Sequence, residues 1–302
     1  MKKVIIITGQ TATGKTSLAL SLAHKKSGEI VSADSRQLYT YLDIITGKDK
    51  EDSRFVRVTT LPSHKNFVIG YYVFDSIRIW GYDIVSPAVQ FSSYNYKHVA
   101  EYIINNTIDK KSIPIVVGGT FFYIKHFLGD IEIQNEPDWN LRLDLEKKNV
   151  DELQHELRDI DPNLLESMNN SDRKNPRRII RKIEIALSNS QEKKSVKSLF
   201  EIDSFIGLKF ASNVHLRLTI AKRVEERLNA GAIDEVKRLL RKGYTRSDPG
   251  LNTIGYTQVL DFLNGELSYD EAVQKWINAE VQYAKRQYTL MKNDPRIAWR
   301  EV

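Results

Sequence analysis

Eight residues near the start of the chain have the types and spacing of a phosphate-binding loop. They run from Gly9 to Thr16, read GQTATGKT, and match the pattern G-x-x-x-x-G-K-[ST]. Glycines in such a loop adopt backbone angles that other residues avoid, and the amide N–H groups surround an anion at a helix N-terminus. Lys15 would add a positive charge, and the Thr16 hydroxyl could bind a phosphate oxygen or a magnesium ion. The pattern therefore predicts a site for a di- or triphosphate.

The elements that must position this loop can be predicted on both sides of it. Residues 4–7 form an uninterrupted β-branched run, typical of a strand buried on both faces, and residues 17–24 are predicted to be helical. Residues 29–35 predict a second strand, parallel to the first because a helix separates the two. Ligands of such sheets bind beyond the carboxyl ends of the strands, so Asp34 and Ser35 should face the same crevice as the loop. The residues alone leave Asp34 open as a helix cap or a magnesium ligand.

A third buried strand is predicted at residues 113–120, which read IPIVVGGT. Its exit is made of Gly118, Gly119 and Thr120, whose backbone and hydroxyl can approach a ligand closely. A nucleotide hydrolase usually places a magnesium-binding aspartate after such a strand, and no acid stands here. This departure argues against ATP hydrolysis at the loop.

Two groups of arginines further along the chain could bind phosphate. Arg173 to Lys182 contains six basic residues and no acid, at a predicted helix start where cations oppose the helix dipole. That arrangement favours phosphate binding over a merely solvated face. In a predicted helix over residues 213–230, Arg223 and Arg227 stand four apart and share a face, which suits a pyrophosphate. Pairing with Glu226 is the alternative.

The overall pattern predicts an α/β protein with a P-loop NTPase-like parallel sheet flanked by helices. Residues 1–128 and 206–302 would form this core, because strand signals give way to amphipathic helices between about 129 and 205, which we predict as a helical insertion domain. Residues 48–52 are predicted to be a solvated loop, and residues 67–74 and 76–82 to be strands.

Composition narrows the class of protein. The 302 residues include no cysteine, which excludes disulfides and thiolate metal sites and suits a reducing cytosol. The chain enters a strand almost at once, without a signal-peptide pattern, and no apolar run is long enough to cross a bilayer. We therefore expect a cytoplasmic protein without a membrane partner. A net charge of +6 is compatible with a polyanionic partner.

Six motifs together resemble those of the bacterial tRNA dimethylallyltransferases, the IPP transferase family, in the family's order. The resemblance extends over residues 4–292 and is weakest between residues 50 and 92. The motifs are the phosphate-binding loop, Asp34-Ser35-x-x-x-Tyr39, Val117-Gly118-Gly119-Thr120, Arg178-x-x-Arg181-x-x-Glu184, Ile254-Gly255-Tyr256 and Ala284-Lys285-Arg286-Gln287.

The resemblance implies a reaction. The dimethylallyl group of dimethylallyl diphosphate would move to the exocyclic N6 amine of the adenosine 3′-adjacent to the anticodon of tRNA, and diphosphate would leave. Asp34 is then the expected general base, and Thr120 is assigned to the reaction centre. The expected catalytic residues are completed by Thr11, Lys15 and Arg227.

The resemblance also implies binding residues. The expected diphosphate site comprises Gly9, Thr11, Ala12, Thr13, Gly14, Lys15, Thr16, Arg223 and Arg227. A magnesium ion (Mg2+) on Thr16 is the expected cofactor. Residues expected to contact the tRNA anticodon stem-loop are Asp34, Ser35, Arg36, Gln37, Arg177, Arg178 and Arg181. A monomer is the default expectation.

The chain departs from the family at several positions. Gln10 stands where the family usually has proline, Arg177 replaces a usual glutamine, and Leu290 replaces a usual tryptophan. A pair of histidines usually precedes the segment that begins at Asp83, and it is absent here. Isoprenoid or tRNA contacts within residues 50–90 are therefore open.

Three alternatives remain from the sequence. A P-loop small-molecule kinase would bind ATP and use Asp34 as a magnesium ligand. An adenylate isopentenyltransferase would modify free AMP, for which a basic helical insert is unnecessary. An RNA-binding protein with a relic phosphate loop would have no reason to retain Lys15, Thr16, Asp34 and Arg227 together.

Overall fold

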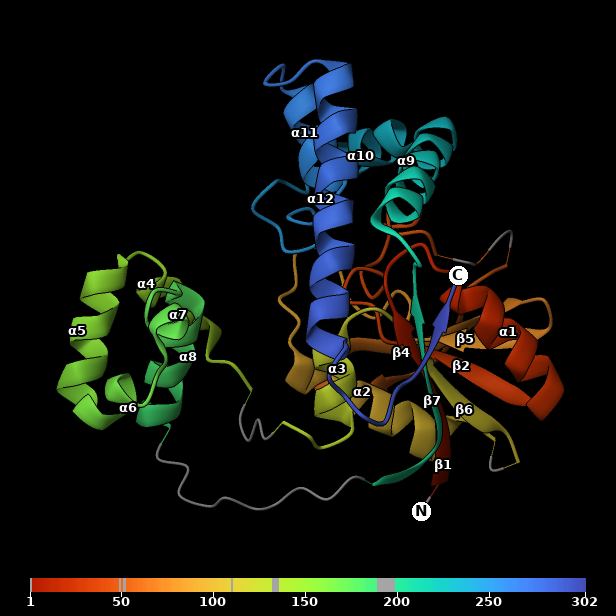
Figure 1. Cartoon of the computed structure of the whole chain (residues 1–302), viewed down its shortest axis with the longest axis horizontal. Coiled ribbons are helices and arrows are strands. Elements are labelled where there is room, and N and C mark those ends of the chain that lie inside the picture. Colours follow the sequence, from red (N-terminus) through yellow and green to blue (C-terminus); the bar gives the residue numbers. More distant parts are fainter. Residues whose placement is uncertain (1, 49, 51–52, 110, 132–135, 189–198) are drawn as a thin grey trace. The chain divides into compact units, whose positions relative to one another are not determined.

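The computed structural model describes residues 2–48, 50, 53–109, 111–131, 136–188 and 199–302 (Figure 1). The chain divides into two compact units, one formed by Met1–Asp130 with Ser198–Val302 and the other by Ile131–Lys197. The predicted insertion, residues 129–205, extends too far at its C-terminal end, because a strand of the larger unit begins at Phe200.

The larger unit is built on one eight-stranded sheet with the order β3-β4-β5-β2-β6-β1-β7-β8. The strands from β5 to β8 in this order are parallel, whereas β3 and β4 pair in antiparallel fashion at one edge. The predicted parallel relation of the first two strands is confirmed, because β1 and β2 both pair in parallel with β6. The strands are β1 (Lys2–Gly9), β2 (Gly28–Ser32), β3 (Val56–Leu61), β4 (His64–Phe74), β5 (Ile77–Trp80), β6 (Ile113–Val117), β7 (Phe200–Lys209) and β8 (Ala298–Glu301).

Both faces of the sheet are covered by helices, which confirms the predicted α/β class. Ile5 and Ile7 of β1 pack in a cluster with Ala19 and Ala23 of α1. Val4 and Ile6 point to the opposite face and belong to the cluster formed with the other helices. Because successive side chains of a strand point to opposite faces, and both faces are covered here, every residue of this run must be apolar. The helices are α1 (Lys15–Lys26), α2 (Ser93–Tyr102) with the π-helical turn η1 (Ile103–Thr107), α3 (Phe121–Phe127), α9 (Asn213–Asn229), α10 (Ala232–Arg241), α11 (Tyr256–Leu263) and α12 (Tyr269–Met291).

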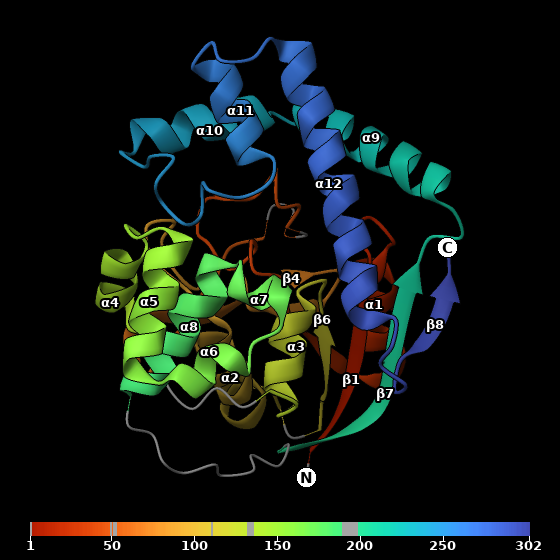
Figure 2. The same ribbon diagram turned by 60° about the vertical axis from the view of Figure 1, so that its left-hand side comes forward.

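Helices α9 to α12 gather beyond the arrowheads of β7 and β8, at the carboxyl-terminal edge of the sheet (Figure 2). The long helix α12 packs against α9 and α11 and also reaches β1 and α3. Residues far apart in the sequence therefore meet at the edge where the phosphate-binding loop lies. No helix in the described ranges is both long and apolar enough to span a membrane.

Within the first hundred residues, one prediction was wrong and one strand was not predicted. Lys48, expected in a solvated loop, has a fully buried side chain, whose ammonium donates to the Tyr39 carbonyl at 2.7 Å and pairs with Asp43 and Asp83. Residues 49, 51 and 52 of that expected loop lie outside the described residues. Strand β3 was not anticipated, although its sequence VRVTTL is rich in β-branched residues and begins with alternating apolar and polar residues.

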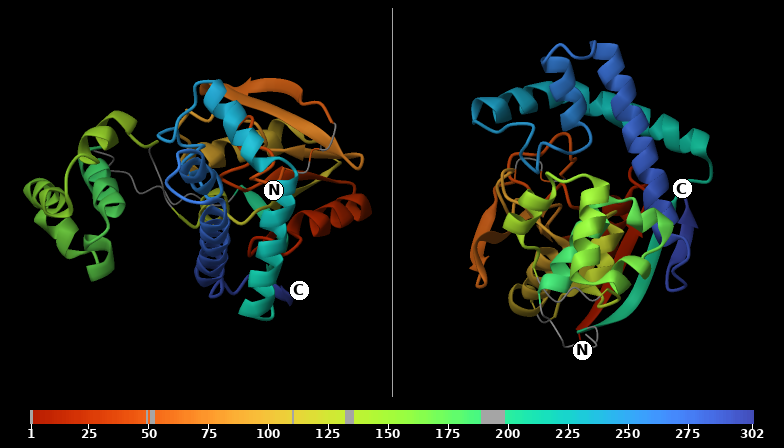
Figure 3. Two further views of the ribbon diagram at one scale, coloured as in Figure 1. Left: turned by 90° about the horizontal axis from the view of Figure 1, so that it is seen from above. Right: turned by 90° about the vertical axis from the view of Figure 1, so that its left-hand side faces the viewer.

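The smaller unit is helical throughout its described part, as the sequence predicts. Its helices are α4 (Trp139–Leu145), α5 (Val150–Ile160), α6 (Pro162–Glu166), α7 (Asn170–Arg173) and α8 (Pro176–Leu187). Figure 3 draws these helices in the yellow-green to green colours of residues 139–187. Their apolar faces form one core made of Leu145, Leu153, Leu157, Leu165, Met168, Ile179, Ile180 and Ile183.

Candidate active site

The predicted phosphate-binding loop connects β1 to α1. Gly9 has a φ of 135°, and a Cβ there would lie 2.1 Å from the Leu208 carbonyl oxygen, so only glycine fits. Gly14, the N-cap of α1, has a φ of 77°. Within the loop, the Lys15 ammonium and the Thr13 hydroxyl both donate to the Gln10 carbonyl, at 2.6 and 2.7 Å. The loop is thus preformed, with its lysine folded back on the backbone.

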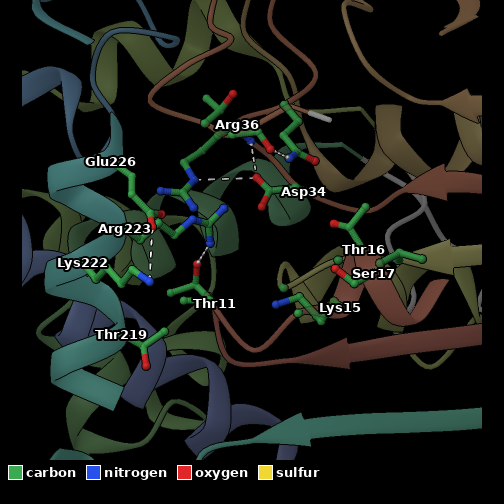
Figure 4. A pocket seen from close by; sticks show the side chains of 18 residues that line it. Thr11, Lys15, Thr16, Ser17, Asp34, Arg36, Thr219, Lys222, Arg223 and Glu226 are labelled. Carbon is green, nitrogen blue, oxygen red and sulfur yellow. Dashed lines mark hydrogen bonds and ion pairs between the residues drawn. The ribbon is translucent and has the colours of Figure 1, made fainter. Parts of the chain in front are cut away.

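A cavity of about 380 Å³ opens in front of this loop. Four segments line it, namely the loop with the start of α1, the connection after β2, the exit of β6 and one face of α9 (Figure 4). The lining residues are Thr11, Ala12, Gly14, Lys15, Thr16, Ser17, Asp34, Arg36, Gln37, Thr46, Gly47, Val117, Gly118, Gly119, Thr219, Lys222, Arg223 and Glu226. The cavity therefore brings together the loop, Asp34 and Arg223 from distant parts of the sequence.

Several residues predicted for the site do not line the cavity. They are Gly9, Thr13, Ser35, Thr120 and Arg227. Gly9 shapes the loop and Thr13 braces it from inside. Ser35 and Thr120 follow the lining residues Asp34 and Gly119 in the chain and bond to each other, and Arg227 is buried next to Arg223.

Asp34 is held by Arg36 rather than by a helix. Its Oδ1 accepts the Arg36 backbone N–H at 2.9 Å and lies 3.7 Å from the Arg36 Nε. No helix begins within residues 33–48, so the helix-cap alternative for Asp34 is wrong. In Figure 4 the second carboxylate oxygen points toward the interior of the cavity. The carboxylate is thereby oriented toward whatever occupies the cavity.

A buried carboxylate on α12 joins two of the site's arginines. Glu280 accepts from the Arg36 Nη1 at 2.9 Å and lies 3.5 Å from the Arg227 Nη1, with only 3% of its side chain exposed. Burial alone would raise the pKa of Glu280, but the two guanidiniums outweigh it and hold the pKa below its usual range. Burial opposes the charge of Arg36, but Glu280 and Asp34 raise its pKa overall. The Arg36 guanidinium also lies over the Tyr283 ring, 5.3 Å from its centroid.

Arg223 and Arg227 differ more than their shared helix face predicts. Arg223 lines the cavity and donates to the Thr11 hydroxyl at 3.3 Å. Arg227 is buried behind it, where burial and the nearby Arg223 lower its pKa to about 9, a value that still leaves it charged at neutral pH. Its Nη2 would lie 3.1 Å from a Cβ at Gly47, so Gly47 leaves room for it. The expected pairing partner, Glu226, instead faces Lys222 at 3.8 Å.

Thr120 lies at the start of α3 and bonds to the segment after β2. Its hydroxyl accepts the Ser35 backbone N–H at 3.0 Å and donates to the Ser35 hydroxyl at 3.3 Å. The Tyr283 side chain also bonds to Thr120; burial and then Asp34 raise the pKa of Tyr283, which therefore stays neutral. Thr120 and Ser35 thus fix the backbone that presents Asp34.

Two buried glutamines that the sequence reading left without a role hold the loop in place. The Gln287 side chain accepts the Thr11 N–H at 2.8 Å and donates to the Gly119 carbonyl at 3.0 Å. Gln10 accepts the Phe210 N–H at 2.8 Å and donates to the Ala284 carbonyl at 3.4 Å. The family's usual proline is therefore replaced by a residue that ties the loop to α12 and β7. Gln287 shares one face of α12 with Glu280 and Tyr283. Their helical spacing is the sequence signal from which a shared role could have been predicted.

Positive charge accumulates around the Lys15 ammonium. Burial and then the neighbouring Arg223 lower the pKa of Lys15 to about 7, whereas Asp34 partly offsets this. An anion placed between these cations would relieve their repulsion and stabilise the charged lysine. The electrostatics are those of a site for a multiply charged phosphate.

The residues present fit a magnesium ion that is bound mainly by substrate. Within the described ranges, no group of three or more histidine or carboxylate side chains is arranged to hold a metal ion. Mg²⁺ commonly keeps several waters and takes one or two protein ligands beside phosphate oxygens. The Thr16 hydroxyl lines the cavity and can serve as one such ligand.

Three of the arginines predicted to contact RNA, namely Arg177, Arg178 and Arg181, lie on α8 of the smaller unit. Arg177 and Arg178 are exposed, and Arg178 pairs with Asp172. Arg181 donates to Glu184 at 3.0 Å, and that buried carboxylate also receives two bonds from Arg142. Arg177 and Arg178 are thus more available to a ligand than Arg181, whose guanidinium contributes to the unit's own structure.

Two family models match the sequence. The model described as IPP transferase matches residues 37–294, and the model described as isopentenyl transferase matches residues 2–58. Two curated relatives are named tRNA dimethylallyltransferase. The protein from Acetivibrio thermocellus is 33% identical over 99% of this chain and 91% of its own length. The protein from Caldanaerobacter subterraneus is 32% identical over 98% of this chain and 91% of its own length.

Solved structures agree with the family models. The tRNA isopentenylpyrophosphate transferase of Bacillus halodurans has a TM-score of 0.68 and 28% identity, over 100% of this chain and 90% of that one. The corresponding structure from Staphylococcus epidermidis has a TM-score of 0.66 and 29% identity, over 100% of this chain and 93% of that one. The predicted P-loop NTPase-like fold is thereby confirmed. With a family model covering most of its length and relatives above 30% identity along all of it, this chain belongs to the IPP transferase family.

Proposed function

We propose that this protein transfers the dimethylallyl group from dimethylallyl diphosphate to the exocyclic N6 amine of an adenosine in tRNA. The observation that carries the proposal is the cavity, where Asp34 faces a cationic phosphate-binding loop and Gly118 and Gly119 follow β6 in place of an acid. The relatives named tRNA dimethylallyltransferase support the same reaction.

The reaction follows from the charges around the cavity. The amine nitrogen attacks C1 of the dimethylallyl group, the C1–O bond breaks, and its electron pair leaves with diphosphate. Loop N–H groups, Lys15 and Arg223 would stabilise the negative charge that develops on the leaving group. The nitrogen loses a proton as it forms the new bond, and Asp34 is the proposed general base that accepts it.

Magnesium would supply further charge on the leaving diphosphate when it is bound. Thr16 is the residue that would hold it, together with diphosphate oxygens and water. The protein's own cations, Lys15 and Arg223, act on the same oxygens, so the site does not depend on carboxylate ligands for the metal.

The RNA is proposed to present the adenosine that is 3′-adjacent to the anticodon. A base in a stacked loop must leave its stack to enter a cavity, as in base-flipping enzymes. Asp34, Arg36 and Gln37, which line the cavity, would contact that base, and Ser35 would support them. Arg177 and Arg178 would bind phosphates of the anticodon stem, with Arg181 supporting their helix. We further propose a monomer acting in the cytoplasm.

The kinase and the AMP-modifying alternatives have less support. A kinase would use Asp34 as a magnesium ligand, whereas the Arg36 guanidinium lies 3.7 Å from Asp34 Oδ1 and its positive charge opposes a metal ion there. An enzyme for free AMP has no use for a separate helical unit with exposed arginines. The relatives' names favour tRNA over both.

The deciding experiment is incubation of the protein with labelled dimethylallyl diphosphate and unmodified tRNA, followed by nucleoside analysis. We expect label on N6 of one adenosine, and we expect Asp34→Ala to reduce turnover at least about a hundredfold while tRNA binding persists. Label on free AMP, or phosphate transfer from ATP, would support an alternative. Unchanged turnover of Asp34→Ala would remove Asp34 from the role of base.

A further inference from the structure

The segment that leaves the cavity at Gln37 and returns to it at Thr46 carries an exposed aromatic residue in an unusual conformation. Tyr41, near the middle of this segment, has a φ of 67°, and 49% of the residue is exposed. A positive φ is a genuine outlier for a bulky side chain, for which glycine is the usual choice. Such strain persists where the surroundings over-determine it, and it concentrates at functional sites.

Contacts on both sides of Tyr41 hold its backbone in place. The Thr40 N–H donates to the Val85 carbonyl at 2.8 Å. The Asp43 N–H donates to the Glu235 carboxylate at 2.9 Å, and the following N–H donates to the same oxygen. The ring is therefore presented by a rigid segment rather than by a loosely held loop.

A cation and a second aromatic ring gather at Tyr41. The Lys242 Nζ, at the C-terminus of α10, lies 4.6 Å from the centroid of the Tyr41 ring. The Tyr244 ring has its centroid 6.4 Å away at an interplanar angle of 42°, and its hydroxyl lies 3.1 Å from the Ser86 hydroxyl. Arg241 is exposed beside Lys242. Exposed rings next to phosphate-binding cations are the means by which proteins hold unstacked nucleotides of single-stranded RNA.

We infer that Tyr41, Lys242 and Tyr244 form a second RNA contact, in which a nucleobase of the tRNA loop other than the modified adenosine stacks on Tyr41 and its phosphate meets Lys242. This inference rests on the proposed function. Both ends of the segment line the cavity, so a nucleotide at Tyr41 belongs to the same single-stranded loop as the adenosine inside. The contact would help to hold the loop open while one base is everted.

The test compares four variants in binding to unmodified tRNA at one fixed salt concentration. Tyr41→Gly removes the ring and suits the positive φ, so it keeps the fold. Tyr41→Leu keeps the strain and the apolar bulk but removes the π face. Tyr41→Phe keeps the π face. Tyr269→Leu alters a comparably exposed tyrosine on α12, 46% exposed, and serves as the matched control.

Removal of one base–aromatic stack should raise the Kd for tRNA about fivefold or more in Tyr41→Gly and Tyr41→Leu. Tyr41→Phe and Tyr269→Leu should bind as the wild type does. KM for dimethylallyl diphosphate should stay unchanged in all four, because a general defect in the cavity would alter both substrates. Anticodon stem-loops with one abasic site at each loop position in turn should identify a nucleotide whose removal weakens the wild type but not Tyr41→Gly.

Wild-type affinity of Tyr41→Gly for tRNA would overturn the stacking inference while prenyl transfer by the wild type still supports the proposed function. Equal losses of affinity in Tyr41→Phe and Tyr41→Leu would overturn it as well, since the π face would then be irrelevant. A wild-type chain that transfers no prenyl group to tRNA would instead overturn the proposed function, and this inference with it.

Discussion

At the scale of single residues, the cavity is organised by an excess of positive charge. Lys15, Arg36 and Arg223 line the cavity, Arg227 is buried behind Arg223, and Glu280 lies between Arg36 and Arg227. Two carboxylates, Glu280 and Asp34, cannot neutralise four cations, so the mutual repulsion of the cations is unfavourable until an anion binds. A bound diphosphate compensates this charge. Its binding should therefore be coupled to protonation of Lys15, the cavity cation whose pKa is lowered most.

Proton uptake on diphosphate binding is the consequence expected for Lys15. Its pKa is lowered to about 7 in the free protein, and a bound anion raises that pKa, so the complex holds a proton that the free protein lacks above pH 7. Calorimetry in buffers of different ionisation enthalpy should show about one proton taken up near pH 8 and almost none near pH 6. The same measurement on Lys15→Met is the control, because ionisation of the diphosphate itself contributes equally to both proteins and cancels when they are compared. Equal uptake by both proteins would contradict this assignment.

At the scale of elements, α12 ties the cavity together. Glu280, Tyr283 and Gln287 stand on one face of this helix. Glu280 pairs with Arg36 and Arg227, Tyr283 bonds to Thr120, and Gln287 bonds to the phosphate-binding loop. The helix therefore connects three loops that follow three different strands. This is a structural task, since none of the three helix residues lines the cavity.

Truncation of Gln287 should loosen two of those loops at once. Gln287→Ala leaves the Thr11 N–H and the Gly119 carbonyl without their partner, at a cost of about 1–3 kcal/mol for each buried group. Urea unfolding should show the lower stability, and KM for dimethylallyl diphosphate should rise. Lys285→Ala, which truncates an exposed residue of the same helix, should leave both unchanged. A Gln287→Ala protein as stable as the wild type would show that the loop holds its own shape.

At the scale of the whole molecule, the proposed chemistry and the proposed contacts with the anticodon stem belong to different units. The cavity belongs to the larger unit, and the exposed Arg177 and Arg178 belong to the helical unit with its own core. Changes to these arginines should therefore affect tRNA binding without altering the diphosphate site.

Charge reversal on α8 tests this division. Arg177→Glu with Arg178→Glu should weaken tRNA binding and lower the magnitude of the slope of log K against log salt by about 1.8, because each phosphate of a duplex that the protein neutralises adds roughly 0.9 to that slope. KM for dimethylallyl diphosphate should not change. Reversal of Lys147 and Arg158, two exposed cations elsewhere in the same unit, is the matched control. A salt slope that α8 reversal leaves unaltered would mean that Arg177 and Arg178 face solvent.

The sequence by itself determined the local parts of this protein. Three patterns are each made of consecutive residues: the apolar run before Gly9, the loop from Gly9 to Thr16, and the glycines after β6. Few structures are compatible with such patterns, so the strand, loop and helix could be predicted where they occur. The helical unit was equally readable, because its apolar residues recur with the period of a helix.

Only the tertiary structure decided which distant residues complete the site. The sequence suggests a solvated Lys48, yet its side chain is fully buried and pairs with Asp43 and Asp83. The sequence suggests the same role for Arg227 and Arg223, yet only Arg223 lines the cavity. Gln287 and Glu280 come within reach of the loop and its arginines because α12 crosses the carboxyl edge of the sheet. Such partners carry no local pattern, since ion pairs and buried hydrogen bonds depend on distance in space and on exclusion of water, and both arise only when the chain has packed.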